Sequence, residues 1–159
     1  MIEFVTSIAD KLKSRPYRDE KEVDTLKDAA PAFQWGYIEP GQDLTDPKLS
    51  VGYAKRESLP KWLFFVGAEY DLLCRESKEM IMDFMELEGK ERDDAMYEFE
   101  KGTVKWKMVR GVVHGYTHWT PGGNPADKEF RVKRREETFE EVGEWLFGGP
   151  IAEATPRDK

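Results

Sequence analysis

Two side chains that could carry acid–base chemistry each follow an apolar run of strand length. Asp71 comes just after KWLFFVGA, residues 61–68, and His114 comes just after TVKWKMVRGVV, residues 103–113. If these runs are neighbouring parallel strands, their carboxyl ends meet at the edge of the sheet where open α/β sheets gather functional groups. A carboxylate beside an imidazole holds the ring in one tautomer and stabilises its protonated form, so the other ring nitrogen can act as a base. The sequence therefore predicts an Asp71–His114 acid–base pair.

Each of these residues also has a local explanation. An aspartate after a strand commonly forms a turn or caps the next helix, and a His-Gly pair commonly fits loop geometry. Both residues occur, in this order, after two predicted strands, and this combination favours an acid–base pair over two unrelated local features.

The segments around the pair predict alternating strands and helices. The continuous apolar run 61–68 is typical of a strand covered on both faces, whereas 103–113 alternates apolar and basic residues like a strand nearer an edge. Helical spacing of apolar residues predicts a helix over about 76–88, ended by Gly89, and a last helix over about 128–147, ended by Gly148. The last helix has Phe139, Val142 and Leu146 on one face. The order strand, helix, strand, helix predicts parallel strands joined by a right-handed crossover. The charged segment from about 88 to 102 is interpreted as a solvated surface excursion.

The first 60 residues predict little regular structure. Residues 1–14 form either a short amphipathic helix or the end of a strand, and prolines recur through 15–60, which allows at most short helices there. That loop-rich part nevertheless holds Phe33, Trp35 and Tyr37, so we expect it to pack on another surface. The predicted organisation is a connecting segment (1–60), a strand-helix-strand-helix part (61–150) and a tail (151–159).

Composition excludes several classes of function. The 159 residues carry 25 Lys+Arg against 32 Asp+Glu, a formal net charge of −7, which disfavours nucleic acid and anionic membranes as partners. No apolar stretch approaches the roughly 18 residues of a membrane span, and the first residues lack the apolar core of a secretory signal. The single cysteine, Cys74, excludes an internal disulfide and fits a reducing compartment. These features predict a soluble, cytoplasmic protein.

Three stretches carry a resemblance to a known family. LPKWLFFVGAEYDLLCRE, residues 59–76, resembles the acidic-residue segment of the α/β-hydrolase superfamily, particularly its hormone-sensitive-lipase-like esterase branch, with a D-x-L-x-x-E motif from Asp71 to Glu76. VVHGYTHW is similar to the histidine loop of that branch, where an aromatic residue, here Tyr116, follows His-Gly. The D-P-x-x-S motif that begins at Asp46 resembles the connecting region before the acid strand. The resemblance covers most of residues 30–147.

The resemblance implies a function for the pair. Asp71 would be the acid and His114 the base of a catalytic triad that hydrolyses a small ester or amide, without a cofactor or a metal. Trp119, close to His114 in the sequence, is a candidate for the wall of the acyl or alcohol pocket.

The sequence departs from the family where the nucleophile is expected. The G-x-S-x-G elbow and the H-G-G-G-type loop that precede the acid in this superfamily are both absent. None of the five serines (Ser7, Ser14, Ser50, Ser58 and Ser77) has glycine two positions away on both sides. A complete fold of this kind needs roughly 250 residues or more. We therefore expect the C-terminal part of an α/β-hydrolase fold, an incomplete sheet of two or three parallel strands, with Met1 near the end of a strand that follows the nucleophile helix. We expect the chain alone to be inactive.

Other functions stay open at this stage. The chain could be a non-catalytic remnant or a partner-binding protein, with the aromatic stretch 33–37 as its interface, and the uncovered edge of strand 61–68 invites self-association. A metal site at His114 and His118 is a weaker alternative, because Gly115 separates them and the glutamate of an H-E-x-x-H motif is missing. Cys74 as a nucleophile is equally weak, because a lone cysteine is usually a small packing residue.

Overall fold

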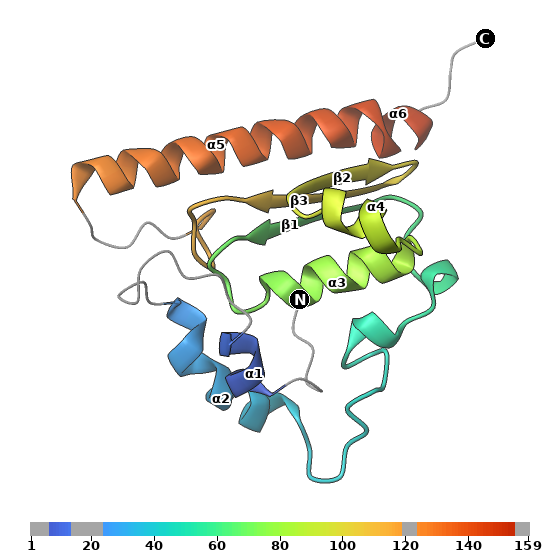
Figure 1. Cartoon of the computed structure of the whole chain (residues 1–159), viewed down its shortest axis with the longest axis vertical. Coiled ribbons are helices and arrows are strands. Elements are labelled where there is room, and N and C mark those ends of the chain that lie inside the picture. Colours follow the sequence, from blue (N-terminus) through green and yellow to red (C-terminus); the bar gives the residue numbers. More distant parts are fainter. Residues whose placement is uncertain (1–6, 14–23, 119–123, 155–159) are drawn as a thin grey trace.

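The computed structural model describes residues 7–13, 24–118 and 124–154 as one small α/β arrangement (Figure 1). The elements follow one another as α1 (Ile8–Lys13), α2 (Thr25–Tyr37), the 3-10 turns η1 (Val51–Tyr53) and η2 (Arg56–Ser58), β1 (Leu63–Ala68), α3 (Cys74–Phe84), α4 (Gly89–Asp94), β2 (Glu98–Lys101), β3 (Val104–Val109), α5 (Pro125–Gly148) and α6 (Pro150–Ala154). None of the helices in these described ranges is long and apolar enough to cross a membrane.

The sheet has three strands in the order β1-β3-β2. β1 pairs with β3 in parallel, from Leu63 opposite Val104 to Ala68 opposite Val109, which confirms the parallel strands predicted from the two apolar runs. β2 pairs with β3 in the antiparallel direction, so the expectation of an all-parallel sheet was wrong. The antiparallel pair is a hairpin with a two-residue turn, in which Gly102 takes the positive φ of 65° that such turns favour.

The charged segment 88–102 is part of the fold rather than a solvated excursion. It forms α4 and the edge strand β2, and its Ala95 is buried in the main core. Arg92 ties α4 to α3 through Asp83, at 2.8 Å, and Glu79, at 2.5 Å. Gly89 begins α4 instead of ending α3, which already stops at Phe84.

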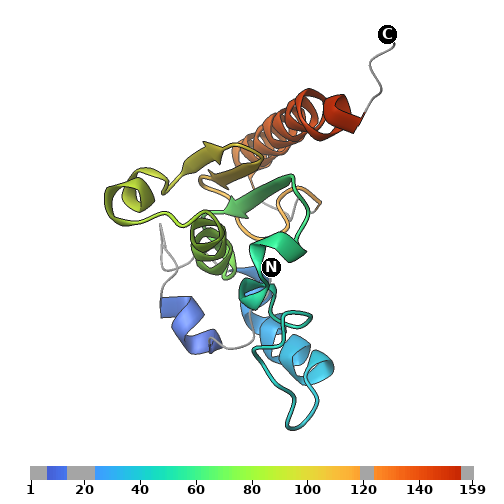
Figure 2. The ribbon, with the colours of Figure 1, turned by 90° about the vertical axis from the view of Figure 1, so that its right-hand side faces the viewer.

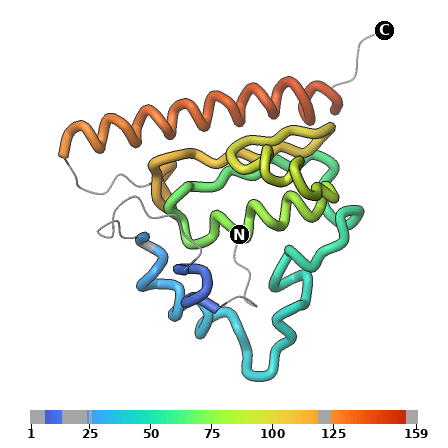
Figure 3. Tube along the Cα trace, in the orientation of Figure 1, coloured from blue at the N-terminus to red at the C-terminus, as the bar shows by residue number. Residues whose placement is uncertain are grey.

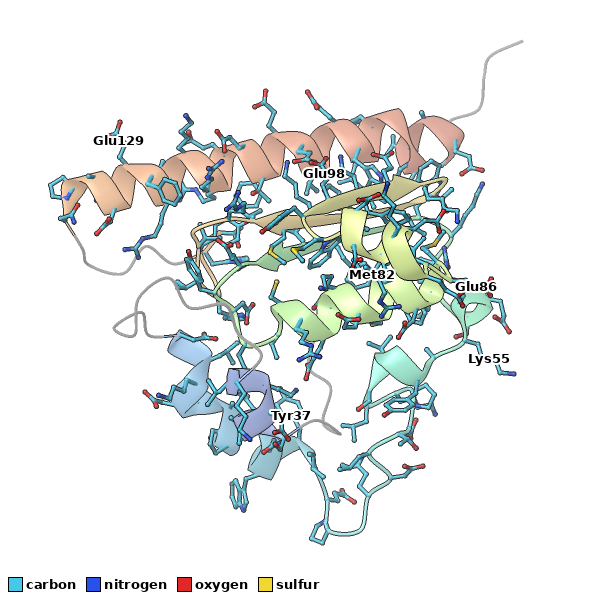
Figure 4. All side chains as sticks on the ribbon, in the orientation of Figure 1. Tyr37, Lys55, Met82, Glu86, Glu98 and Glu129 are labelled. Atoms are coloured by element: carbon cyan, nitrogen blue, oxygen red, sulfur yellow. The ribbon has the colours of Figure 1, made fainter. Side chains whose placement is uncertain are left out.

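Helices α3 and α5 cover opposite faces of the sheet (Figure 2). On the α3 side, Met82 lies between the helix and the sheet and is fully buried together with Ile81 and Trp106 (Figure 4). Gly67 lets this side close, because a Cβ atom there would lie 2.4 Å from the Trp106 ring.

Helix α5 packs on the sheet through a face that the apolar pattern did not identify. Trp145 contacts Phe64, with ring centroids 5.5 Å apart, and Glu141 forms ion pairs with Lys105 and Lys107 of β3. Phe139 and Leu146, two of the three residues expected on one face, are instead exposed. The predicted final helix is confirmed. It begins at Pro125 rather than at about residue 128, because Asn124 caps it and Pro125 fits its first turn.

The N-terminal part is more helical than its prolines suggested. α2 has 13 residues with Pro31 inside, which corrects the expectation of short helices only. Tertiary burial outweighs the hydrogen bond that Pro31 cannot make, since Leu26 and Ala30 pack against Leu72 and Leu73 in the turn between β1 and α3. The trace in Figure 3 shows α1 and α2 together on the α3 side of the sheet.

Two of the three aromatic residues of α2, Trp35 and Tyr37, do not pack on another surface as expected. Trp35 is 88% exposed and Tyr37 is 67% exposed. Phe33 is 40% exposed; its ring lies 6.4 Å from that of Tyr37, and it also lines a small cavity with Ile8 and Leu72. This stretch is therefore an exposed aromatic surface among the described residues.

Candidate acid–base site

The structure brings Asp71 and His114 together at the carboxyl ends of β1 and β3. Two backbone hydrogen bonds continue the strand pairing beyond its last register position, from Glu69 N–H to Val109 O and from Tyr70 N–H to Val112 O, both at 3.0 Å. Asp71 Oδ2 then lies 2.9 Å from His114 Nδ1. The contact predicted from the order of strands and polar residues is therefore present.

Asp71 has a local role and a long-range role at the same time. Its Oδ1 accepts a hydrogen bond from Leu73 N–H at 2.9 Å, and its carbonyl accepts from Cys74 N–H at 3.1 Å, which forms the turn into α3. Its Oδ2 remains for the imidazole. The side chain is only 12% exposed, so water competes little for either oxygen. The local explanation for this aspartate is thus correct and does not exclude the chemical one.

His114 has one ring nitrogen, Nδ1, bound to Asp71. The hydrogen bond that His114 donates to Asp71 raises the pKa of His114 above its usual value, burial opposes this, and the charges of Asp71 and Asp24 add to the rise. The ring is 41% exposed, so the other nitrogen, Nε2, can take part in proton transfer. Gly115, with φ at 73°, turns the chain directly after the ring.

Glu69 ties the His114 loop to the end of β1. Its Oε2 accepts a hydrogen bond from Gly111 N–H at 2.7 Å, and the side chain is largely buried beside Arg110. Gly111 has φ at 77°, and a Cβ atom there would lie 3.0 Å from the Phe130 ring. The sequence pattern predicts no role for Glu69, because a single glutamate that binds a distant backbone N–H leaves no local pattern.

Tyr116 ties the same loop to α5. Its hydroxyl lies 2.8 Å from Thr138 Oγ1, and Thr138 in turn donates to the Arg134 carbonyl at 2.7 Å. The Tyr116 hydroxyl is therefore the donor in the first of these bonds. Burial raises the pKa of Tyr116, so the side chain stays neutral.

Asp24 is a second buried carboxylate, bound to the backbone directly after Asp71. It is 0% exposed, and its Oδ2 accepts a hydrogen bond from Leu72 N–H at 2.6 Å. Its Oδ1 accepts from Leu26 N–H at 2.9 Å, which caps α2. Sequence reasoning missed Asp24, although an aspartate two residues before an apolar helical residue is a usual capping signal.

The competing sites receive no support from the geometry. Burial raises the pKa of Cys74 to about 12, with the Asp71 charge adding to the effect, so its thiol is not a nucleophile near neutral pH. His118 is exposed and bonds Thr117 through Nδ1 at 2.7 Å. Within 7–13, 24–118 and 124–154, no three His, Cys, Asp or Glu side chains lie close enough to hold a metal ion. Trp119, the candidate pocket residue, lies outside the described residues.

A comparison of the sequence with known family models and with curated proteins finds no match. The chemistry of the Asp71–His114 pair is therefore inferred from its geometry and its position in the fold.

Proposed function

We propose that Asp71 and His114 are the acid and the base of a serine ester hydrolase of the hormone-sensitive-lipase-like type. The observation that carries the proposal is the 2.9 Å contact between Asp71 Oδ2 and His114 Nδ1, made by two residues that follow neighbouring parallel strands. In this interpretation β1 and β3 belong to a larger α/β-hydrolase sheet, of which this chain supplies the C-terminal part.

The proposed chemistry uses the two nitrogens of His114 differently. Nδ1–H donates to Asp71, so Nε2 accepts the proton of a serine hydroxyl as its oxygen attacks the ester carbonyl. Asp71 stabilises the imidazolium that results, and the imidazolium then protonates the leaving alcohol. In the second half of the cycle Nε2 takes a proton from water as the water oxygen attacks the acyl-enzyme carbonyl, and the imidazolium returns the proton to the serine oxygen as the acid leaves.

The 159 residues do not supply the serine that this chemistry needs. No G-x-S-x-G motif is present, and Ser77, the serine nearest Asp71 in sequence, bonds the Leu73 carbonyl within α3 at 3.0 Å. Residual catalysis without a nucleophile depends on substrate binding and an oxyanion hole. We therefore expect the purified chain to hydrolyse a short p-nitrophenyl ester no faster than its His114→Ala variant does.

The deciding experiment is the intact mass of the protein from its native source, read with the transcript upstream of the Met1 codon. The proposal expects a longer product with an in-frame G-x-S-x-G. In that product His114→Ala should lower kcat on the order of 10⁶-fold and Asp71→Asn on the order of 10⁴-fold. His118→Ala is the matched control and should retain activity, because this ring is exposed and bonds only its neighbour Thr117 in the described residues. A native product without such a serine, or full activity in His114→Ala, would overturn the proposal.

A second candidate is a non-catalytic protein that binds a partner. The exposure of Trp35 and Tyr37 on α2 favours it, because aromatic side chains are enriched at the centres of interfaces. In that case Trp35→Ala should abolish binding of the partner recovered from the native source, whereas Asp71→Asn should leave it unchanged.

A further inference from the structure

We propose that Asp24 is a positioning residue for the Asp71–His114 pair, holding the loop that carries Asp71 through its bond to Leu72 N–H. The inference rests on the proposed function, because it assigns Asp24 a part in the same acid–base site. It concerns a residue 48 positions from Leu72 in the sequence, on a different element from either member of the pair.

Asp24 is hydrogen-bonded to the peptide group that joins Asp71 to Leu72. Leu72 N–H belongs to the peptide bond that joins Asp71 to Leu72, so the 2.6 Å bond to Asp24 Oδ2 fixes the orientation of that peptide. The next N–H, that of Leu73, is taken by Asp71 itself. Both N–H donors of the turn are therefore bound, and in this turn Asp71 Oδ2 faces His114.

Helix capping alone does not require a carboxylate at this position. An N-cap needs one side-chain oxygen, which serine, threonine or asparagine also provides. Asp24 uses both of its oxygens, one for Leu26 N–H and the other for Leu72 N–H. Only a carboxylate offers two oxygens that both act purely as acceptors. Capping of α2 therefore explains the bond to Leu26 N–H but does not explain the bond to Leu72 N–H.

Asp24 also contributes charge to the site. Two carboxylates act on His114 in the described residues, Asp71 from the loop after β1 and Asp24 from the start of α2, and both raise the pKa of His114. Because Asp24 is fully buried, water screens its field poorly. It therefore favours the imidazolium that forms when His114 accepts a proton.

The test separates capping from positioning. Asp24→Ser keeps an oxygen for the α2 cap but removes the bond to Leu72 and the charge. Asp28→Ser is the matched control, because Asp28 is an exposed acid in the first turn of the same helix. The readout is an NMR pH titration of the imidazole resonances, and the chain has only two histidines, so His118 serves as the reference in the same spectra.

The expected result is a lower titration midpoint for His114 in Asp24→Ser and an unchanged one in Asp28→Ser. An unchanged midpoint in folded Asp24→Ser would overturn the inference. Asp71→Asn distinguishes this failure from that of the proposed function. If neither Asp71→Asn nor Asp24→Ser changes the His114 midpoint, the Asp71–His114 pair itself is absent. If Asp71→Asn lowers the midpoint and Asp24→Ser does not, only the role of Asp24 is wrong.

A measurement on the unmodified chain covers the case in which Asp24→Ser does not fold. Amide exchange of Leu72 should be slow, because its N–H is bonded to a buried carboxylate. Rapid exchange of this amide, with the neighbouring Leu73 amide protected, would show that the Asp24 bond does not hold the turn.

Discussion

His114 Nδ1 lies 2.9 Å from Asp71 Oδ2 although 43 residues separate the two in the sequence. The parallel register of β1 and β3 accounts for this, because it ends both strands at the same level, Ala68 opposite Val109. The pair is therefore a consequence of the sheet, and the hydrogen bonds that Glu69 and Asp24 accept from Gly111 N–H and Leu72 N–H hold the two loops that complete it.

The first prediction concerns the dependence of stability on pH. The Asp71 hydrogen bond raises the pKa of His114 from the ordinary value of 6.5, so the folded protein binds this proton more tightly than the unfolded chain. The stabilisation is fully present below about pH 6.5 and is lost as the pH rises through the raised folded pKa. Urea denaturation of the wild type and of His114→Gln from pH 5.5 to 8.5 should show their difference in free energy of unfolding shrinking with pH. A difference that grows with pH would contradict the predicted sign.

A second prediction concerns Glu69. Glu69→Ala removes the acceptor for Gly111 N–H and should lower the free energy of unfolding by about 1–3 kcal/mol, the usual range for the loss of a part-buried hydrogen bond to a charged group. It should also shift the His114 imidazole resonances, because the loop before His114 loses its anchor. Glu57→Ala, at an exposed glutamate of η2, is the control and should change the stability by less than about 0.5 kcal/mol. Equal stabilities for the two variants would show that the Gly111 bond contributes nothing.

The third prediction concerns Cys74. Its thiol is buried, and burial raises its pKa to about 12, so the reactive thiolate is scarce at pH 8. Reaction with a disulfide reagent should therefore be slow in the native protein and fast in 6 M guanidinium, where an ordinary thiol of pKa about 8.5 is released. Rapid labelling of the native chain would indicate that the α3 end of the site opens readily.

The sequence predicted the elements whose own side chains carry the signal. A continuous apolar run located β1, and apolar periodicity located α3, β3 and α5. The polar residues after the two parallel strands predicted the Asp71–His114 contact. Helix α2 was missed because Pro31 is a local signal, whereas the burial of Leu26 against Leu72 is a tertiary one.

Strand β2 was missed because its charges were interpreted as a sign of solvation. In the structure these charges are cross-strand partners, with Glu98 opposite Lys107 and Glu100 opposite Lys105. The alternation of acidic residues in 98–101, matched to that of basic residues in 103–107, is the signal that would have found the hairpin. Asp24 carries only the local capping signal of α2 and Glu69 carries none, since the partners that matter for the site are distant backbone N–H groups.

The last prediction concerns the open edge of β1. The N–H groups of Leu63 and Glu69 donate to the carbonyls of Thr103 and Val109, at the two ends of β3. Because successive N–H groups along a strand alternate in direction, those of Phe64, Val66 and Ala68 point away from β3. No strand pairs with that side among the described residues, and β1 carries no charge or proline to block one. The opposite edge, β2, is short and carries Glu98, Glu100 and Lys101, the usual protection of an edge strand.

We therefore expect the purified chain to self-associate through β1, with a sedimentation-average mass that rises with concentration. Hydrogen exchange tests the edge directly: the amides of Phe64, Val66 and Ala68 should exchange quickly in dilute solution and become protected as the concentration increases. The amides of Phe65 and Gly67, which the same alternation directs toward β3, are the internal control and should be protected throughout. A chain that stays monomeric at every concentration, with all five amides unchanged, would show that the β1 edge does not recruit a second copy.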